Sequence, residues 1–158
     1  MSALVDLITR TLQTTGPATA ATTAAVAACG AIDDGNAVAP VNAVSHIAWG
    51  DEAAEQDDAS LKYTATGATL NAAAIASWAA IYELGFGRAA RRGNIKTAIA
   101  GGIATAALAY VTDYYIVPKR LTPGFEKRLS SPSMFAVYAA LAASLPMASL
   151  AAGLRAQR

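Results

Sequence analysis

The sequence predicts an all-α membrane protein, an antiparallel four-helix transmembrane bundle with a short re-entrant or interfacial helical segment. Two observations lead to this fold class. The 158 residues are 54% hydrophobic and only 15% charged, which is unusual for a soluble domain. The charges also leave four windows nearly free of ionisable side chains, each long enough to cross a hydrocarbon core about 30 Å thick. We expect these spans at residues 11–32, 63–84, 97–117 and 134–154 of a single membrane domain, residues 1–158.

The first expected span is the least apolar of the four. Residues 11–32 are rich in Thr and Ala, so we expect neighbouring helices to surround this span. Apolar side chains recur at helical spacing from Leu4 to Leu12, and Asp6 and Arg10 stand four residues apart, where they can pair. The start of the chain is therefore predicted to form an amphipathic interfacial turn.

The single cysteine, Cys29, closes a short run that could also be a lipoprotein processing box after a signal peptide. The segment before it contains Pro17 and is rich in Thr and Ala rather than Leu. A signal peptide needs a basic region followed by a strongly apolar one, so this alternative is less favoured. We expect Cys29 to serve as a small packing residue, since one cysteine cannot form an internal disulfide.

Small residues recur every four positions in the later spans. Such stripes let helix backbones approach closely in lipid, although a high alanine content could produce them by chance. The stripes are Ala72, Ala76 and Ala80 in the second span, Ala98, Gly102 and Ala106 in the third, and Ala136, Ala140, Ser144, Ala148 and Ala152 in the fourth. Pro146 should bend the fourth span, because it removes a backbone donor.

The segment 36–50 is apolar but too short to cross a bilayer, and Pro40 suits the first turn of a helix there. We expect it to lie along the interface or to re-enter the membrane. It should lie on the same side as the end of the third span, whose only charge is Asp113. Ionisable groups in a membrane by default mark a functional site or a neutralising pair. The candidate polar cluster consists of His46, Asp113, Asn42, Trp49, Tyr110 and Tyr114.

Each of these residues has a plainer alternative. Asp113 could reach headgroup water or a basic neighbour at the membrane boundary, and His46 could bond to the backbone. Tyr110 and Tyr114 could be interfacial anchors. Glu83, near the other membrane face, is expected to form an interfacial ion pair beside Arg88.

The distribution of charge predicts the topology. Most acidic residues fall between Asp33 and Asp58, including those of an acidic loop at 51–62, whereas basic residues follow the second and the last span. Short cytoplasmic loops are enriched in Lys and Arg, so both termini are expected in the cytoplasm and the acidic loop outside. The connection 118–133 disagrees, because it is basic and yet falls outside.

Basic residues beside the spans are expected to bind anionic lipid headgroups, at about 1 kcal/mol each near the surface. These residues are Arg88, Arg91, Arg92, Lys96, Lys119, Arg120, Lys127 and Arg128. No catalytic motif is present, and one histidine without a second one or a cysteine pair makes a poor metal site. We therefore expect no catalytic residue, no metal and no cofactor. A net charge of +1 also gives no attraction to nucleic acid.

The runs Ala39–Gly50 and Ser77–Glu83 carry a resemblance. With its pattern A-P-x-N-A-x-S-H-x-x-W-G, the first run resembles a group of small, uncharacterised bacterial inner-membrane proteins with four helices. This resemblance implies a multi-pass protein of the bacterial inner (cytoplasmic) membrane and supplies no activity.

Three functions remain open from the sequence. The favoured one is a non-enzymatic structural, accessory or lipid-interacting role, with membrane lipids as partners and a larger membrane complex or a homo-oligomer as further candidate partners. The alternative is a small proton-linked transporter or channel that uses His46 and Asp113. A membrane enzyme acting on a lipid or a quinone is the third.

Overall fold

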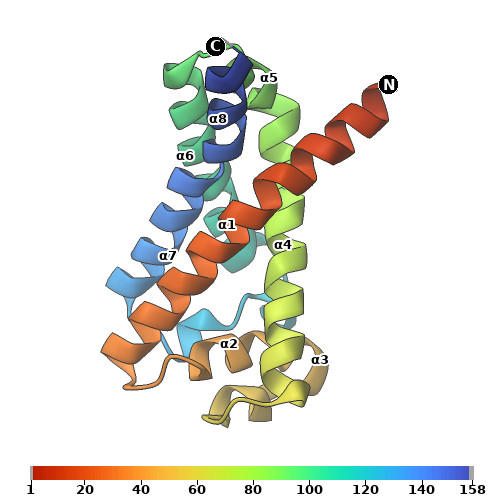
Figure 1. Ribbon diagram of the computed structural model, residues 1–158. Coiled ribbons are helices and arrows are strands. Elements are labelled where there is room, and N and C mark those ends of the chain that lie inside the picture. Colours follow the sequence, from red (N-terminus) through yellow and green to blue (C-terminus); the bar gives the residue numbers. More distant parts are fainter. Residues whose placement is uncertain (1, 157–158) are drawn as a thin grey trace.

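The computed structural model of the protein describes residues 2–156, and every regular element in that range is helical. The all-α prediction is confirmed. Four long helical segments run side by side (Figure 1). They are α1 (Ala3–Asp33), α4 (Thr66–Tyr82), α6 (Ile95–Val111) and the pair α7 (Ser131–Ser144) and α8 (Met147–Ala156). Helix α1 contacts α4 and α7, and α6 contacts the same two helices.

Side-chain caps explain where three of these helices begin. Ser2, Asn94 and Ser130 each accept a hydrogen bond from the backbone N–H three residues later, which satisfies a donor that a helix start leaves free. Helix α1 is continuous from its first turn, and its amino-terminal end projects away from the other helices (Figure 1). The expected pair of Asp6 and Arg10 is confirmed, with Arg10 Nε donating to Asp6 Oδ2 at 3.0 Å.

Short helices complete the connections. They are α2 (Ala39–Val44), α3 (His46–Trp49), η1 (Asp51–Glu55), α5 (Arg88–Arg91), η5 (Lys119–Leu121) and η6 (Phe125–Lys127). Helices α2 and α3 pack across one end of the long segments, and α5 lies beside α8 at the other end (Figure 1). Pro40 occupies the first turn of α2, as predicted. A Cβ on Gly67 would lie 2.0 Å from the Val41 carbonyl oxygen, so α2 crosses α4 where only glycine fits.

Three stretches have the wider π-helical hydrogen bonding. They are η2 (Leu61–Ala65), which opens α4, η3 (Glu83–Gly87), which joins α4 to α5, and η4 (Thr112–Ile116), which extends α6. A π turn changes the direction of the side chains it carries and often occurs at functional sites. Glu83 and Asp113, the two acidic residues within the expected spans, both lie in such turns.

Two segments are long and apolar enough to cross a membrane by length and composition, Ile95–Ile116 and Ser131–Ala156. Helices α1 and α4 do not meet the same measure, since Thr and Ala replace much of their Leu and Ile. The four-span topology therefore stays a prediction. The expected bend at Pro146 is confirmed, because α7 ends at Ser144 and α8 begins at Met147.

The small-residue stripe expected in the third span is confirmed. Ala98, Gly102 and Ala106 are all buried. A Cβ on Gly102 would lie 2.3 Å from the carbonyl oxygen of Ala142, so the backbones of α6 and α7 meet there. This contact depends on the absence of a side chain on α6.

The stripes expected in the second and fourth spans are mostly half-buried and do not form the innermost face of their helices. Helix α4 buries Ile75 and Ala79 instead. Of the fourth stripe only Ser144 is buried, whereas Val137 and Leu141 of α7 face the interior. A four-residue spacing is right for a helix, but alanine occurs on every face of these two helices and so does not mark the inner one.

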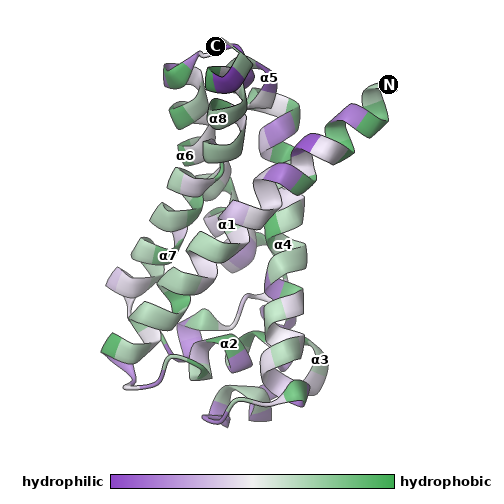
Figure 2. Ribbon diagram, viewed as in Figure 1, coloured by the Kyte–Doolittle hydropathy of each residue, from purple (hydrophilic) through white to green (hydrophobic). Residues whose placement is uncertain are grey.

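Large aliphatic side chains face away from the other helices. Ile95, Ile99 and Ile103 form one exposed face of α6, and Phe135 is exposed on α7. The buried positions are mostly small or hydroxylated, including Thr14, Ala18, Thr22, Ala79, Ala98, Thr105, Ala106, Ala109, Ser144 and Ser149. Hydrophilic residues concentrate at the two ends of the long helices (Figure 2). Larger apolar side chains complete the interior in two clusters, with Ile75, Leu141 and Leu145 in one and Val26, Phe125 and Met134 in the other.

Candidate functional site

Glu83 is the centre of a polar network at the end of the fold that contains α5. Its side chain is fully buried. Arg10 Nη1 donates to Oε2 at 3.1 Å, and Thr14 Oγ1 donates to Oε1 at 2.7 Å. Ser149 Oγ also donates to Oε1, and Arg91 Nη2 lies 3.8 Å from that oxygen. One carboxylate therefore joins α1, η3, α5 and α8.

The expected partner of Glu83 was wrong, although the ion pair itself exists. Arg10 and Arg91 supply the positive charge, while Arg88 is exposed. A Cβ on Gly87 would lie 1.9 Å from Glu83 Oε2, so the carboxylate lies back over this glycine toward the interior. The π turn places Gly87 where an ordinary side chain would displace the carboxylate.

Asp113 is the centre of a second site, near the opposite end of the long helices. It is half-buried in η4, and its Oδ2 accepts a hydrogen bond from Tyr138 Oη at 2.7 Å. Two further tyrosines pack on the Tyr138 ring. The ring centroids of Tyr110 and Tyr114 lie 5.3 Å and 6.1 Å from it, both with edge-on geometry. Such pairs prefer this arrangement, because a positive ring edge meets a negative face.

A cavity of about 90 Å³ lies beside Asp113. Its polar lining comes from Thr22, Asn71, Asp113 and Tyr138, and Trp78 contributes an aromatic wall. Aliphatic residues of α4 and α7 and the 121–125 connection supply most of the rest. Helices α1, α4 and α7, together with Val44 of α2 and Ile47 of α3, therefore line a partly open, mostly apolar space with one carboxylate in its wall.

The structure places His46 in a separate environment. Its ring is buried, and Nε2 lies 2.9 Å from the carbonyl oxygen of Thr122. Since a carbonyl oxygen can only accept, Nε2 carries the proton of this bond. Thr122 Oγ1 in turn donates to Glu126 at 2.7 Å. His46 thus ties α3 to the connection between the third and fourth long segments.

Asn42 and Trp49 also bond away from Asp113. Asn42 Nδ2 donates to the carbonyl oxygens of Gln56 and Asp58 at 2.9 Å and 3.1 Å. Trp49 Nε1 donates to the carbonyl oxygen of Lys62 at 3.0 Å. Of the six candidate residues, the structure brings Asp113 together with Tyr110 and Tyr114. Within residues 2–156 no hydrogen bond links His46, Asn42 or Trp49 to Asp113.

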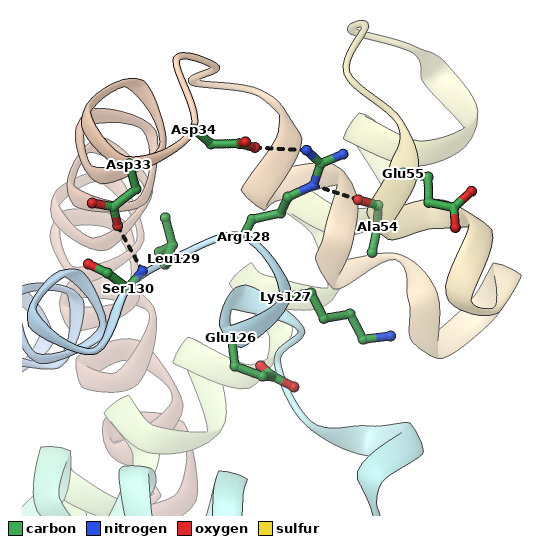
Figure 3. A pocket seen from close by; sticks show the side chains of 9 residues that line it. All are labelled: Asp33, Asp34, Ala54, Glu55, Glu126, Lys127, Arg128, Leu129 and Ser130. Carbon is green, nitrogen blue, oxygen red and sulfur yellow. Dashed lines mark hydrogen bonds and ion pairs between the residues drawn. The ribbon is translucent and has the colours of Figure 1, made fainter.

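The acidic loop 51–62 and the basic connection 118–133 meet at the end of the fold that contains α2 and α3. Arg128 donates to Asp34 at 2.8 Å and to the Ala54 carbonyl oxygen at 2.5 Å (Figure 3). It also donates to Asp57 at 2.9 Å. Asp34, Ala54 and Arg128 border an open surface hollow of about 630 Å³. Lys127 pairs with Asp51 nearby, and this hydrogen bond lowers the pKa of the Asp51 carboxyl below its ordinary 3.8.

The eight residues expected at lipid headgroups therefore fall into two sets. Lys127 and Arg128 are paired with the acidic loop, and Arg91 faces Glu83. The others are exposed and form no ion pair within the described part of the chain. This exposed set is Arg88, Arg92, Lys96, Lys119 and Arg120.

Comparison with known proteins gives no match to a family, a curated protein or a solved structure. Among residues 2–156 no group of three or more His, Cys, Asp or Glu is placed to hold a metal ion.

Proposed function

We propose that the chain is a small multi-pass integral membrane protein with four spans and a structural, accessory or lipid-interacting role. The supporting observation is the distribution of side chains. The exposed face of α6 carries Ile95, Ile99 and Ile103, while the interior carries small and hydroxylated residues. In water such a contiguous apolar face would mark an interaction site or an aggregation hazard. In lipid the same face contacts acyl chains, and small interior residues allow close helix packing.

The four spans are α1, then α4 with its flanking π turns, then α6 with η4, and last α7 with α8. The first two are the less apolar, and several of their Thr hydroxyls donate to carbonyl oxygens of their own helix, whereas the hydroxyls of Thr11 and Thr19 are buried without a partner in the described part of the chain. Thr22 Oγ1, for example, donates to the Ala18 carbonyl oxygen at 2.8 Å. Such back-bonding removes much of the cost of placing a hydroxyl in hydrocarbon. Contacts of α1 with α4 and α7 cover it further.

The connection 118–133 still disagrees with the charge rule. Lys127 and Arg128 pair with Asp51, Asp34 and Asp57, but acidic residues carry little weight in this rule, and Lys119 and Arg120 are exposed. The basic residues after the second and the last span favour cytoplasmic termini, and on that ground we propose an outer location for residues 33–62 and 118–130. On the resemblance of residues 39–50, we place the protein in the bacterial inner membrane.

The cytoplasmic end has the features of a lipid-binding surface. Arg88, Arg92 and Lys96 are exposed there, and the projecting start of α1 presents Leu4 and Leu12. Basic residues attract anionic headgroups and the leucines can enter the acyl boundary. We therefore propose anionic lipids as the partners of this end.

Extraction and labelling test the membrane assignment. The protein should stay with membranes in alkaline carbonate and dissolve only in detergent. In a Cys29→Ser background, Asp58→Cys should react with a membrane-impermeant maleimide in intact cells, and Arg92→Cys only after permeabilisation. A monodisperse particle in detergent-free buffer would overturn the membrane assignment, and the reverse labelling pattern would overturn the orientation.

Liposome binding tests the lipid role. Substituting Arg88, Arg92 and Lys96 together by Gln should reduce retention of anionic lipid, since each removes about 1 kcal/mol of attraction near the surface. A control variant replaces the two exposed basic residues at the other end, Lys119 and Arg120, by Gln and should retain the lipid. Equal loss in both variants, or in neither, would contradict a headgroup site at the cytoplasmic end.

A proton-linked transporter or channel is the second candidate. The observation that favours it is Asp113, a carboxylate beside an interior cavity and without an ion pair within residues 2–156. His46, the other proposed group, is bonded to the Thr122 carbonyl oxygen. This candidate requires pH-driven proton flux in liposomes that Asp113→Asn abolishes. Flux that is absent, or unchanged by this substitution, would eliminate it.

A further inference from the structure

We propose that the cavity beside Asp113 is a binding site for a small organic cation, a primary ammonium that carries a short apolar group. This goes beyond a lipid-interacting role, since the site lies between the helices. Four features of the cavity support it, namely its carboxylate, its polar neighbours, its aromatic wall and its size.

The carboxylate of Asp113 lacks a positive partner within the described chain. Its one hydrogen bond comes from Tyr138 Oη to Oδ2, and no Lys, Arg or His among residues 2–156 forms an ion pair with it. Glu83, in the equivalent π turn of the second segment, has two arginines and two hydroxyl donors. Charged groups away from water are normally paired. Unlike Glu83, Asp113 therefore has a carboxylate that is available to pair with a cation from outside the protein.

The polar lining suits an ammonium group rather than an anion. Asp113 Oδ1 remains free to accept a hydrogen bond, and the Asn71 side chain has a carbonyl oxygen that also accepts. Asn71 and Thr22 both line the same cavity. An ammonium has three donors and no acceptor, so these oxygens match its requirements.

The apolar lining suits the carbon part of such a ligand. Trp78 and Tyr138 present aromatic surface, and Ile75 and Leu141 are aliphatic. Aromatic faces attract cations as well as hydrocarbon. A space of about 90 Å³ matches roughly three water volumes at about 30 Å³ each. It therefore admits an ion of a few heavy atoms, such as isobutylammonium.

Tryptophan fluorescence gives a direct test, because Trp78 lines the cavity and Trp49 does not. The chain has two tryptophans, so Trp49→Phe leaves Trp78 as the only one. We would titrate the purified full-length variant, in an amine-free mild detergent at pH 7, with isobutylammonium. Isobutanol, of the same shape but neutral, is the matched probe. We expect the fluorescence of Trp78 to change saturably with isobutylammonium. Isobutanol should bind at least about tenfold more weakly, because it lacks one charge-assisted hydrogen bond.

Variants assign this binding to the carboxylate. Asp113→Asn keeps an acceptor for Tyr138 and should weaken isobutylammonium about tenfold or more, while leaving isobutanol unchanged. Asp58→Asn removes an acid from the external loop and should change neither. Tyr138→Phe retains the Asp113 carboxylate, and this variant should still bind isobutylammonium more tightly than isobutanol. It provides a second test if the Asp113→Asn variant does not fold. Equal binding of the two probes, no saturable change, or unaltered binding to Asp113→Asn would overturn the proposal.

Two sources could supply the ammonium, a free amine or the headgroup of an aminophospholipid. Nanodiscs of phosphatidylcholine, with and without phosphatidylethanolamine, distinguish them. With either source, isobutylammonium should bind saturably to the protein in nanodiscs of phosphatidylcholine alone. Competition by phosphatidylethanolamine identifies the lipid headgroup, and unchanged affinity identifies a free amine.

Discussion

Replacing Glu83 by alanine tests whether one buried carboxylate holds three helical segments together. The substitution removes the acceptor of Arg10, Thr14 and Ser149 at once. Breaking a buried ion pair by deleting one partner costs about 3–5 kcal/mol in soluble proteins. Arg10 keeps its second partner Asp6 at 3.0 Å, so the loss should lie at the lower end. The orphaned hydroxyls add about 0.6 kcal/mol each, the mean found for hydrogen bonds in membranes.

The expected loss of unfolding free energy for Glu83→Ala is therefore about 4 kcal/mol. Glu83→Gln keeps an oxygen for the hydroxyl donors but loses the charge, and should cost about 1.5–3 kcal/mol. Both are measured by reversible unfolding in mixed detergent micelles, followed by circular dichroism. Glu55→Gln, in the exposed acidic loop, is the control and should change stability by less than about 0.5 kcal/mol.

A double-mutant cycle with Ser149→Ala tests whether the network acts as a unit. Because the Ser149 hydroxyl donates to the Glu83 carboxylate, the two losses should be non-additive by about 0.5 kcal/mol or more. Strict additivity, or a Glu83→Ala variant as stable as the parent chain, would refute the view that this carboxylate joins α1 to α8.

Three further predictions concern other contacts. Gly102→Ala should destabilise the chain by about 1–3 kcal/mol, because its Cβ would meet a carbonyl oxygen of α7 at 2.3 Å; Gly85→Ala, with open space around it, is the control and should be near neutral by the same unfolding assay. Arg128→Gln should accelerate amide exchange of residues 54–58 about fivefold, the effect of losing about 1 kcal/mol, and unchanged exchange would contradict its role in holding the loop. Since the pKa of Asp51 is lowered in the folded state, its contribution is present above its ordinary value of 3.8 and is lost as the pH falls through the folded-state pKa. The protection of η1 amides, relative to their intrinsic exchange rates at the same pH, should therefore fall in acid, and Lys127→Gln should weaken this pH dependence.

Local sequence features were enough to predict several contacts. Pro40 opens a helix and Pro146 interrupts one, because the proline ring lacks a backbone donor wherever the chain goes. Asp6 and Arg10 pair because positions four apart are neighbours on any α-helix. The grouping of Asp113 with Tyr110 and Tyr114 follows in part from the same spacing on one helix.

The contacts of Glu83 could not be predicted from local sequence features. Glu83 meets Arg10 from 73 positions away, so no spacing rule could pair them, and its nearest sequence neighbour Arg88 was the wrong partner. The signal in the sequence was Glu83 itself, an acidic residue within an otherwise uncharged window. Its burial could have been suspected, but its four partners could not.

The sequence by itself determined that the chain is helical, that Pro40 opens a helix and Pro146 interrupts one, and that its charges lie between uncharged stretches, although Pro17 lies inside α1. These properties depend on residues close together in the chain. Only the tertiary structure decided which face of each helix is inside, because an Ala-rich helix has similar residues on every face. It also decided that Lys127 and Arg128 meet the acidic loop and that His46 and Asp113 bond separately. Such contacts depend on the packing of distant segments, and the π turns at Glu83 and Asp113 change the direction of both side chains.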